Sequence, residues 1–245
     1  MNLAGKTALV TGGSRGIGAA IAKALARDGA DVAITYVSAE DKARAVVDDI
    51  RALGRRAVAI RADSADMAEV EAAVERASSE LGRLDILVNN AGIARMGPLR
   101  EVTLEDLDRT LSIHVRASFV ASQAAARHMG EGGRIVNIGS CLAERVAGPE
   151  MTLYAMSKAA LIGLSKGLAF DLGPRGITAN VVQPGPTDTD MNPADGEHAQ
   201  QQRGKLALGH YGSADDIAAT VVHLAGPGGR FITGASIAVD GGFAA

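Results

Sequence analysis

Residues 7–18, TALVTGGSRGIG, decide the fold of this chain. A short apolar run enters a glycine-rich turn, and the segment that follows, AAIAKALARDGADV, has the apolar spacing of a helix. We therefore expect a strand, a turn and a helix. Glycines let the backbone approach a bound group closely, and the first turn of a helix offers free N–H groups and a positive dipole end to a phosphate. The turn, which includes Ser14, Arg15 and Ile17, predicts a pyrophosphate site. A plain strand-to-helix turn is the alternative, because the spacing differs from the common GxGxxG pattern.

Short β-branched runs alternate with longer helical patterns along the chain. DILV and RIVNI are apolar almost throughout, as in strands buried on both faces. The alternation predicts right-handed βαβ units, and hence an α/β fold of the doubly wound Rossmann type with about seven parallel strands and helices on both faces. No linker interrupts the pattern, so we expect a single domain over residues 1–245. The expected strands are TALVT, DVAITY, RAVAIRA, DILVNN, RIVNIGS, ITANVVQ and ASIAVD.

Composition and charge exclude several classes of protein. The 245 residues include 25 basic and 28 acidic side chains, a net charge of −3, which gives no footprint for nucleic acid or an anionic membrane. No apolar run approaches the roughly 18 residues of a membrane span, and no secretory pattern opens the chain, so we expect a cytoplasmic protein. Cys141 is the only cysteine, which rules out an intrachain disulfide; its simplest interpretation is a small buried side chain. No spacing of histidines or carboxylates suggests a catalytic metal.

Tyr154 and Lys158 stand four positions apart in the run YAMSK, and the flanking sequence has a helical pattern that puts both on one face. A free phenol, with a pKa near ~10, is a poor proton donor at neutral pH. A fixed ammonium group nearby stabilises the phenolate and lowers that pKa. The pair therefore suggests acid–base catalysis, although two such residues on one helix face also form a common packing pair.

Five motifs, in their order and spacing, resemble the short-chain dehydrogenase/reductase family and span nearly the whole chain. The family's TGxxxGxG turn corresponds to Gly12, Gly16 and Gly18, and its NNAG element to residues 89–92. Its Ser-Tyr-Lys active site corresponds to Ser140, Tyr154 and Lys158. Its PG turn and following threonine correspond to Pro184, Gly185 and Thr189, and ITGASIAVDGG is similar to its last strand. The chain looks most like the family's 3-oxoacyl-[acyl carrier protein] reductases and related ketoreductases.

The end of the second expected strand bears on the choice of cofactor. NAD enzymes of this fold usually place an acidic residue there, but this chain has Tyr36 and Ser38, with no carboxylate before Glu40. Ser38 can hydrogen-bond to a ribose 2′-phosphate and Arg15 can supply positive charge, which favours NADP(H). The alternative is that Arg15 is only a solvated turn residue.

The resemblance implies further cofactor contacts. Asp63, with Ser64 beside it, would accept a hydrogen bond from the adenine amino group, although Asp63 is also placed to cap the next helix. Around the nicotinamide, the expected contacts come from Asn90, Ala91, Gly92, Thr187 and Thr189. The polar region at about residues 186–211 would close over cofactor and substrate; a mobile surface loop is the alternative.

For carbonyl reduction, the resemblance gives each active-site residue a role. Tyr154 would donate the proton and Ser140 would hydrogen-bond to the carbonyl oxygen. Lys158 would bind the nicotinamide ribose and, together with the charge of the oxidised ring, lower the pKa of Tyr154. Many relatives also have an asparagine in the helix before the fifth strand, where it supports a water chain to the lysine. This chain has His114 there, which either takes the relay role or is a core histidine without one.

These observations predict an NADPH-dependent carbonyl reductase that acts on a 3-oxoacyl thioester or related ketone. An alcohol or sugar dehydrogenase working in the oxidative direction is one alternative. A non-catalytic nicotinamide-cofactor-binding sensor or scaffold is another. The expected partner is a small-molecule carbonyl substrate, free or carrier-bound. By resemblance we also expect a homotetramer, with the helices after Thr103 and Thr152 at one interface and the C-terminal strand region at another.

Overall fold

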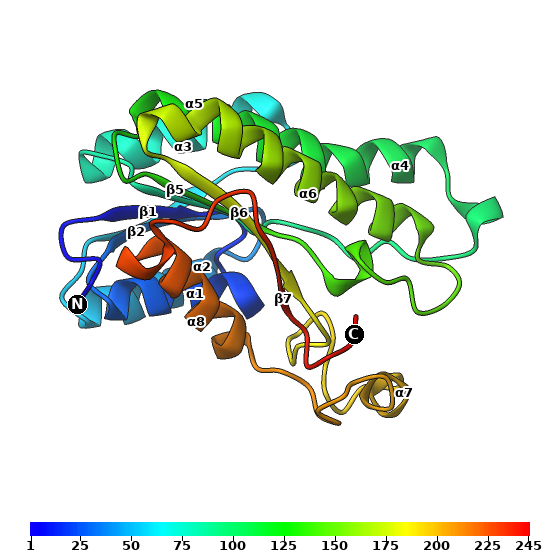
Figure 1. Ribbon diagram of the computed structural model, residues 1–245. Helices are drawn as coiled ribbons and strands as arrows, with labels where there is room; N and C mark the ends of the chain where they lie inside the picture. Colours follow the sequence, from blue (N-terminus) through cyan, green and yellow to red (C-terminus); the bar gives the residue numbers. More distant parts are fainter.

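The computed structural model describes residues 1–245 and places one parallel sheet between two layers of helices (Figure 1). The strand order is β3-β2-β1-β4-β5-β6-β7, which confirms the predicted doubly wound α/β class. Each predicted strand overlaps an observed one. The strands are β1 (Thr7–Val10), β2 (Asp31–Tyr36), β3 (Ala57–Arg61), β4 (Ile86–Asn89), β5 (Arg134–Ile138), β6 (Thr178–Pro184) and β7 (Ser236–Val239).

Helices cover both faces of the sheet. One face is covered by α1 (Gly16–Arg27), α2 (Glu40–Ala52) and α8 (Ala214–Ala225) (Figure 1). The other is covered by α3 (Met67–Leu81), α5 (Ala117–His128) and α6 (Thr152–Leu172), with α4 (Leu104–Leu111) on the same side. A short helix, α7 (Ala199–Arg203), lies in the long segment after β6. None of the helices has the length and apolar character that crossing a membrane requires.

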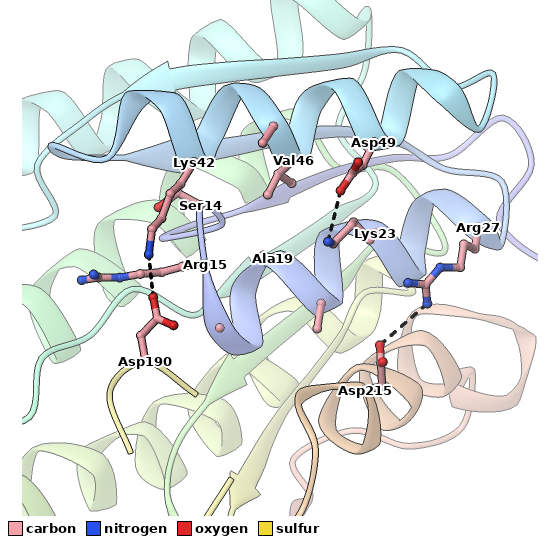
Figure 2. A pocket seen from close by; sticks show the side chains of 13 residues that line it. Ser14, Arg15, Ala19, Lys23, Arg27, Lys42, Val46, Asp49, Asp190 and Asp215 are labelled. Atoms are coloured by element: carbon pink, nitrogen blue, oxygen red, sulfur yellow. Dashed lines mark hydrogen bonds and ion pairs between the residues drawn. The ribbon is translucent and has the colours of Figure 1, made fainter. Parts of the chain in front are cut away.

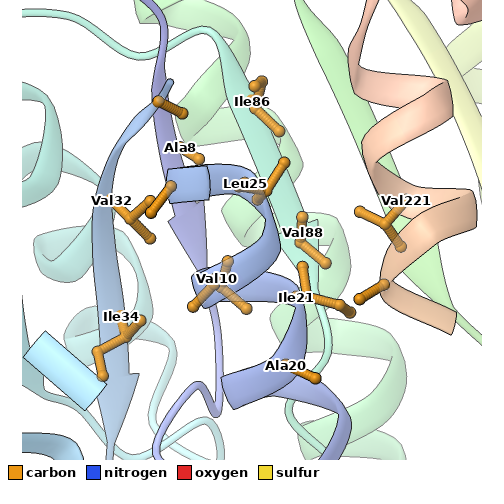
Figure 3. Packing of buried hydrophobic residues seen from close by; sticks show 14 of the residues in the cluster. Ala8, Val10, Ala20, Ile21, Leu25, Val32, Ile34, Ile86, Val88 and Val221 are labelled. Atoms are coloured by element: carbon orange, nitrogen blue, oxygen red, sulfur yellow. The ribbon is translucent and has the colours of Figure 1, made fainter. Parts of the chain in front are cut away.

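The larger core cluster shows why α1 docks on the sheet. Ile21 and Leu25 lie one turn apart on α1 and are completely buried. They point at strand residues such as Val10 and Val88, while Val221 approaches from α8 (Figure 3). Burying a side chain of this size contributes about 1.5–3 kcal/mol. The apolar face of α1 therefore fixes the position of the glycine turn at its amino end.

The sheet changes its direction of growth at β1, which pairs with β2 on one side and with β4 on the other. Val10 lies opposite Val88, so the turns that follow β1 and β4 are neighbours at the carboxyl edge of the sheet. At the other edge, the Asp85 carboxylate accepts hydrogen bonds from Thr7 N–H at 2.9 Å and Lys6 Nζ at 3.2 Å, which ties the two strands together. In open α/β sheets, such a change of direction is where ligands bind.

Candidate active site

The glycine turn after β1 has room for a bound group because side chains are missing where the backbone is crowded. Gly12 has φ of +64°, a conformation that favours glycine, and a Cβ there would lie 3.0 Å from Ala91 Cα. A Cβ on Gly18 would lie 2.4 Å from both Asn90 Nδ2 and Gly12 O. Helix α1 begins at Gly16, and no side chain caps its first turn. The free N–H groups of this turn and the close-packed glycines fit the pyrophosphate of a dinucleotide.

The segment after β4 holds this turn in shape. Asn90 Nδ2 donates to Thr11 O at 2.9 Å and to Gly12 O at 3.1 Å. In return, Thr11 Oγ1 accepts from the N–H groups of Asn90 and Ala91, at 2.9 and 3.0 Å. The second asparagine of the NNAG motif therefore positions the glycine turn. Ala91 and Gly92 continue from it toward His114 and Lys158.

At the predicted adenine end, the side chains expected to face the cofactor lie at the ends of β2 and β3. Tyr36 is half-buried at the end of β2, and Ser38 and Arg15 are exposed. Asp63 Oδ1 accepts from Ala65 N–H at 2.9 Å in the turn after β3, next to the buried Ser64. The alternative interpretation of Asp63 as a helix cap is wrong, because the residue that caps α3 is Asp66, whose side chain accepts from Ala68 and Glu69 N–H groups.

The three predicted catalytic side chains meet at the carboxyl edge of the sheet. Ser140 lies two residues after the end of β5, and Tyr154 and Lys158 lie one turn apart near the start of α6. Lys158 Nζ donates to Ile138 O at 2.9 Å and lies 5.8 Å from the centre of the Tyr154 ring. Ser140 Oγ accepts from Leu142 N–H at 3.2 Å, so its own proton can be donated elsewhere. The structure brings the three together, and their catalytic roles stay predictions.

Local sequence orients α6 so that these residues face the sheet. From Lys158 onward, its buried positions recur every three or four residues, at Lys158, Leu161, Ser165, Ala169 and Leu172. Tyr154 stands one turn before Lys158. The buried face of α6 therefore carries Lys158 into the interior, where its charge is desolvated.

In the protein without a cofactor, burial has the largest effect on the pKa values of Tyr154 and Lys158. It raises the pKa of Tyr154 to about 12, an effect that the Ser140 side chain opposes. It also lowers the pKa of Lys158 to about 8. Both shifts disfavour the charged form, since a buried charge loses its hydration. The predicted lowering of the tyrosine pKa, which included the charge of an oxidised nicotinamide, does not arise from Lys158 by itself. Tyr154 is therefore a protonated phenol at neutral pH, the form that a proton donor needs.

His114 lies in a π-helical turn, Ser112–Arg116, between α4 and α5. Such turns hold one more residue than an α-helical turn and often occur at functional sites. Nε2 of His114 accepts from Ile93 N–H at 3.0 Å, so Nδ1 carries the proton and faces Ser157 Oγ at 2.8 Å. Ser157 Oγ in turn donates to Tyr154 O at 2.7 Å. The imidazole thus links the segment after β4 to the first turns of α6.

The charge state of His114 follows from its surroundings. Its side chain is buried, and burial, followed by the positive charge of Lys158, lowers its pKa to about 3. The ring is neutral throughout the physiological range. His114 therefore acts through hydrogen bonds in a fixed tautomer, and it supplies no titration near its ordinary pKa.

The segment after β6 forms a further side of the candidate active site. Gly185 passes so close to the end of β7 that a Cβ would lie 2.5 Å from Asp240 Cα, and Thr187 Oγ1 donates to Gly185 O at 2.9 Å. The side chain of Thr189 approaches the glycine turn, 3.5 Å from the place of a Cβ on Gly16. Pro184, at the end of β6, directs the chain there. Of the predicted cofactor residues of this segment, Thr189 therefore lies beside the glycine turn.

Sequence reasoning missed a buried residue behind Ser140. Gln183, in β6, is fully buried; its Oε1 accepts from Ser140 N–H at 2.6 Å and its Nε2 donates to Ser236 Oγ at 3.2 Å. It holds the backbone on which Ser140 stands. Its signal in the sequence was a glutamine that ends the otherwise β-type run ITANVVQ.

A buried polar chain also went unpredicted. Asn89 Nδ2 donates to Asn137 Oδ1 at 2.8 Å, and Asn137 Nδ2 donates to Ser165 Oγ at 2.9 Å. This chain joins β4, β5 and α6 beneath the site. An asparagine inside the apolar run RIVNI was the signal, because a buried amide needs partners.

Comparison with known proteins places the chain in a family. The family model described as enoyl-(acyl carrier protein) reductase matches residues 12–244. A short chain dehydrogenase from Burkholderia cenocepacia, solved in complex with NADP, is 64% identical with a TM-score of 0.99, and a blue fluorescent protein from a metagenomic library, solved with NADPH, is 64% identical with a TM-score of 0.98; each covers 100% of both chains. The cyclic-di-GMP-binding biofilm dispersal mediator protein of Escherichia coli is 46% identical over 241 residues, 98% of either chain. With the sheet order, the glycine turn and the Ser140, Tyr154 and Lys158 arrangement, these likenesses show that the chain is an oxidoreductase of the short-chain dehydrogenase/reductase family.

Proposed function

We propose that this protein reduces a carbonyl group to a secondary alcohol, with NADPH as the hydride donor and Tyr154 as the proton donor. The observation that carries the proposal is the meeting of Ser140, Tyr154 and Lys158 beside a glycine turn that fits a dinucleotide. Tyr154 holds its proton at neutral pH, since burial raises its pKa to about 12. NADPH supplies the hydride when bound.

Each of the four active-site residues then has a definite task. Ser140 donates a hydrogen bond to the carbonyl oxygen and holds it near the phenol. Tyr154 gives its proton to that oxygen as negative charge develops there. The ammonium group of Lys158 stabilises the phenolate that remains, and His114, at the family's relay position, joins Ile93 to the first turns of α6 through its two ring nitrogens.

The cofactor assignment rests on charge. No carboxylate stands at the end of β2, and the exposed Arg15 lies at the start of α1 beside the glycine turn. The two similar structures solved with NADP or NADPH support the same choice. We expect NADPH to be preferred to NADH in kcat/KM and Ser38→Asp to shift that ratio toward NADH, because an acid repels a 2′-phosphate and binds a 2′-hydroxyl. A wild-type preference for NADH would show that the NADP(H) assignment is wrong.

The apolar side chains that pack beside Tyr154, which we call the wall, favour an uncharged, apolar substrate. Cys141, Leu142, Ala155, Leu206 and Phe243 form a small buried cluster that packs against Tyr154. Burial raises the pKa of the Cys141 thiol to about 12, so it is no nucleophile. Two nearby cations are engaged with backbone carbonyls: Arg145 donates to Phe243 O at 2.7 Å and Lys205 to Ala147 O at 3.1 Å. A 3-oxoacyl thioester or a neutral ketone suits this wall better than an anion does.

A screen of NADPH oxidation over acetoacetyl thioesters, diketones, quinones and simple ketones tests the reaction. Tyr154→Phe should lower kcat on any active substrate by about 10²-fold or more, because the positioned acid is removed, while the Kd of NADPH changes little. Near wild-type turnover in Tyr154→Phe would place the chemistry elsewhere. Activity on alcohols or sugars with NADP, and none on the carbonyls, would favour the oxidative alternative.

The Escherichia coli relative, named for binding cyclic di-GMP, favours a second candidate: a protein that binds nucleotides without turnover. Calorimetry with cyclic di-GMP, with and without NADPH, separates the two. Binding of cyclic di-GMP, with no turnover of any carbonyl or alcohol substrate in the screen, would support the second candidate. The expected 3-oxoacyl substrate, the homotetramer, the single domain and the cytoplasmic location stay predictions.

A further inference from the structure

A cleft of about 420 Å³ opens beside the glycine turn, between α1, α2 and the segment after β6 (Figure 2). Most of its charged side chains are paired across it. The pairs are Lys23 with Asp49 at 3.2 Å, Arg27 with Asp215 at 3.7 Å and Lys42 with Asp190 at 2.7 Å. Arg15 is the one cation of the cleft without a carboxylate partner, and it lies next to the Lys42 and Asp190 pair (Figure 2).

The Lys42 pair differs from the other two in what it connects. Lys23 and Asp49 join α1 to α2, Arg27 and Asp215 join α1 to α8, and all three helices pack on the sheet. Lys42, near the start of α2, instead reaches Asp190 in the segment after β6, 148 positions away. Their side chains are 56% and 58% exposed, and exposed pairs of this kind are weak and easily exchanged. The contact therefore links α2 to the segment after β6 only weakly.

We propose that Lys42 is a specificity-determining residue for the 2′-phosphate of NADP(H), and that Asp190 holds its ammonium group only until the phosphate replaces it. The inference rests on the proposed function. A phosphate monoester carries close to two negative charges and three strong acceptor oxygens, so it is a better partner for Lys42 than one carboxylate is. Arg15 and Lys42 together match its charge. Asp190 competes for Lys42 and therefore opposes phosphate binding.

Calorimetric Kd values for NADPH, NADH and adenosine 2′,5′-bisphosphate at low ionic strength test the exchange. Lys42→Met keeps the length of the side chain and removes its charge; it should weaken binding of the two ligands with a 2′-phosphate about tenfold and leave NADH unchanged. Asp190→Asn should strengthen the same two ligands two- to threefold, since the competitor is gone. Lys23→Met and Asp49→Asn, the matched pair between packed helices, should leave the NADPH to NADH ratio unchanged.

The signs of the two effects decide the outcome. If Asp190→Asn weakens NADPH binding as Lys42→Met does, the Lys42–Asp190 ion pair is required in the cofactor-bound state. The proposed replacement of Asp190 by the phosphate is then wrong. If the wild type prefers NADPH and Lys42→Met keeps the full preference, Lys42 has no part in specificity and only this inference falls. A wild type that binds NADH as tightly as NADPH would overturn this inference together with the proposed cofactor.

Discussion

The imidazole of His114 meets the phenol ring of Tyr154 edge-on, with ring centres 5.8 Å apart and planes at 87°. The same imidazole bonds to Ile93 and faces Ser157. A neutral histidine in one tautomer offers an acceptor at Nε2 and a donor at Nδ1. An asparagine amide also offers one acceptor and one donor, so both residue types can make this pair of contacts.

His114→Asn should therefore keep most of the turnover, and His114→Ala should lower kcat by on the order of tenfold with little change in the Kd of NADPH. Because its folded-state pKa is lowered to about 3, the profile of kcat against pH should show no inflection at 6.5 that His114→Asn removes. Ser157→Ala is the matched variant that keeps the imidazole and removes the partner of Nδ1, together with the hydrogen bond of Ser157 Oγ to Tyr154 O. If His114→Ala folds normally and turns over at the wild-type rate at every pH, the histidine is a packing residue.

Gln183 offers a test of how Ser140 is positioned. Gln183→Leu leaves the buried Ser140 N–H without its acceptor, which costs about 1–3 kcal/mol of unfolding free energy, and it should also lower kcat more than it changes KM. Ser236→Ala removes the other partner of Gln183 and an exposed hydrogen bond to Glu144, and it should behave much like the wild type. Urea unfolding and steady-state kinetics give both readouts. Equal losses in the two variants would mean that Gln183 serves stability alone.

Lys158 should destabilise the folded chain by itself at neutral pH. Its folded-state pKa of about 8 lies below the 10.5 of an ordinary lysine, so the unfolded chain binds the proton more readily between these values. The unfolding free energy of the wild type therefore decreases as pH falls through this window, and the decrease due to Lys158 is complete below pH 8. Lys158→Met should therefore raise the unfolding free energy at pH 7 by on the order of 1–2 kcal/mol, with a smaller gain at pH 9.5, while turnover is abolished. A less stable Lys158→Met at pH 7 would contradict this.

Gly18→Ala should impair cofactor binding. The new Cβ would lie 2.4 Å from Asn90 Nδ2 and from Gly12 O, so the contact that shapes the glycine turn must shift. We expect a weaker Kd for NADPH, by on the order of tenfold, measured by calorimetry. Gly130→Ala, where no atom lies within 4 Å of the new Cβ, is the control and should bind normally. Unchanged affinity in Gly18→Ala would show that the turn does not hold the phosphates.

The sequence predicted the parts of this molecule that depend on local pattern. The strands and the glycine turn follow from periodicity and composition, and the approach of Tyr154 to Lys158 follows from helical spacing. Contacts that depend on register between distant strands did not follow. Gln183 meets Ser140 only because β6 pairs with β5 in one particular register, and the pKa of Tyr154 depends on how deeply the finished fold buries it.

The junction of β1 with β4 has a consequence for how the chain assembles. Thr11 and Asn90, which shape the glycine turn together, are 79 positions apart, so we expect their contact to form after the local strands and helices between them. Closing so long a loop carries an entropic cost and is a slow step in folding. The chain thus becomes able to bind the cofactor only late in folding. A ligand that binds only the completed junction shifts the folding equilibrium toward the native state. In refolding experiments, enhancement of NADPH fluorescence should appear with the slowest phase; its appearance in the earliest phase would show that the two halves of the sheet join first.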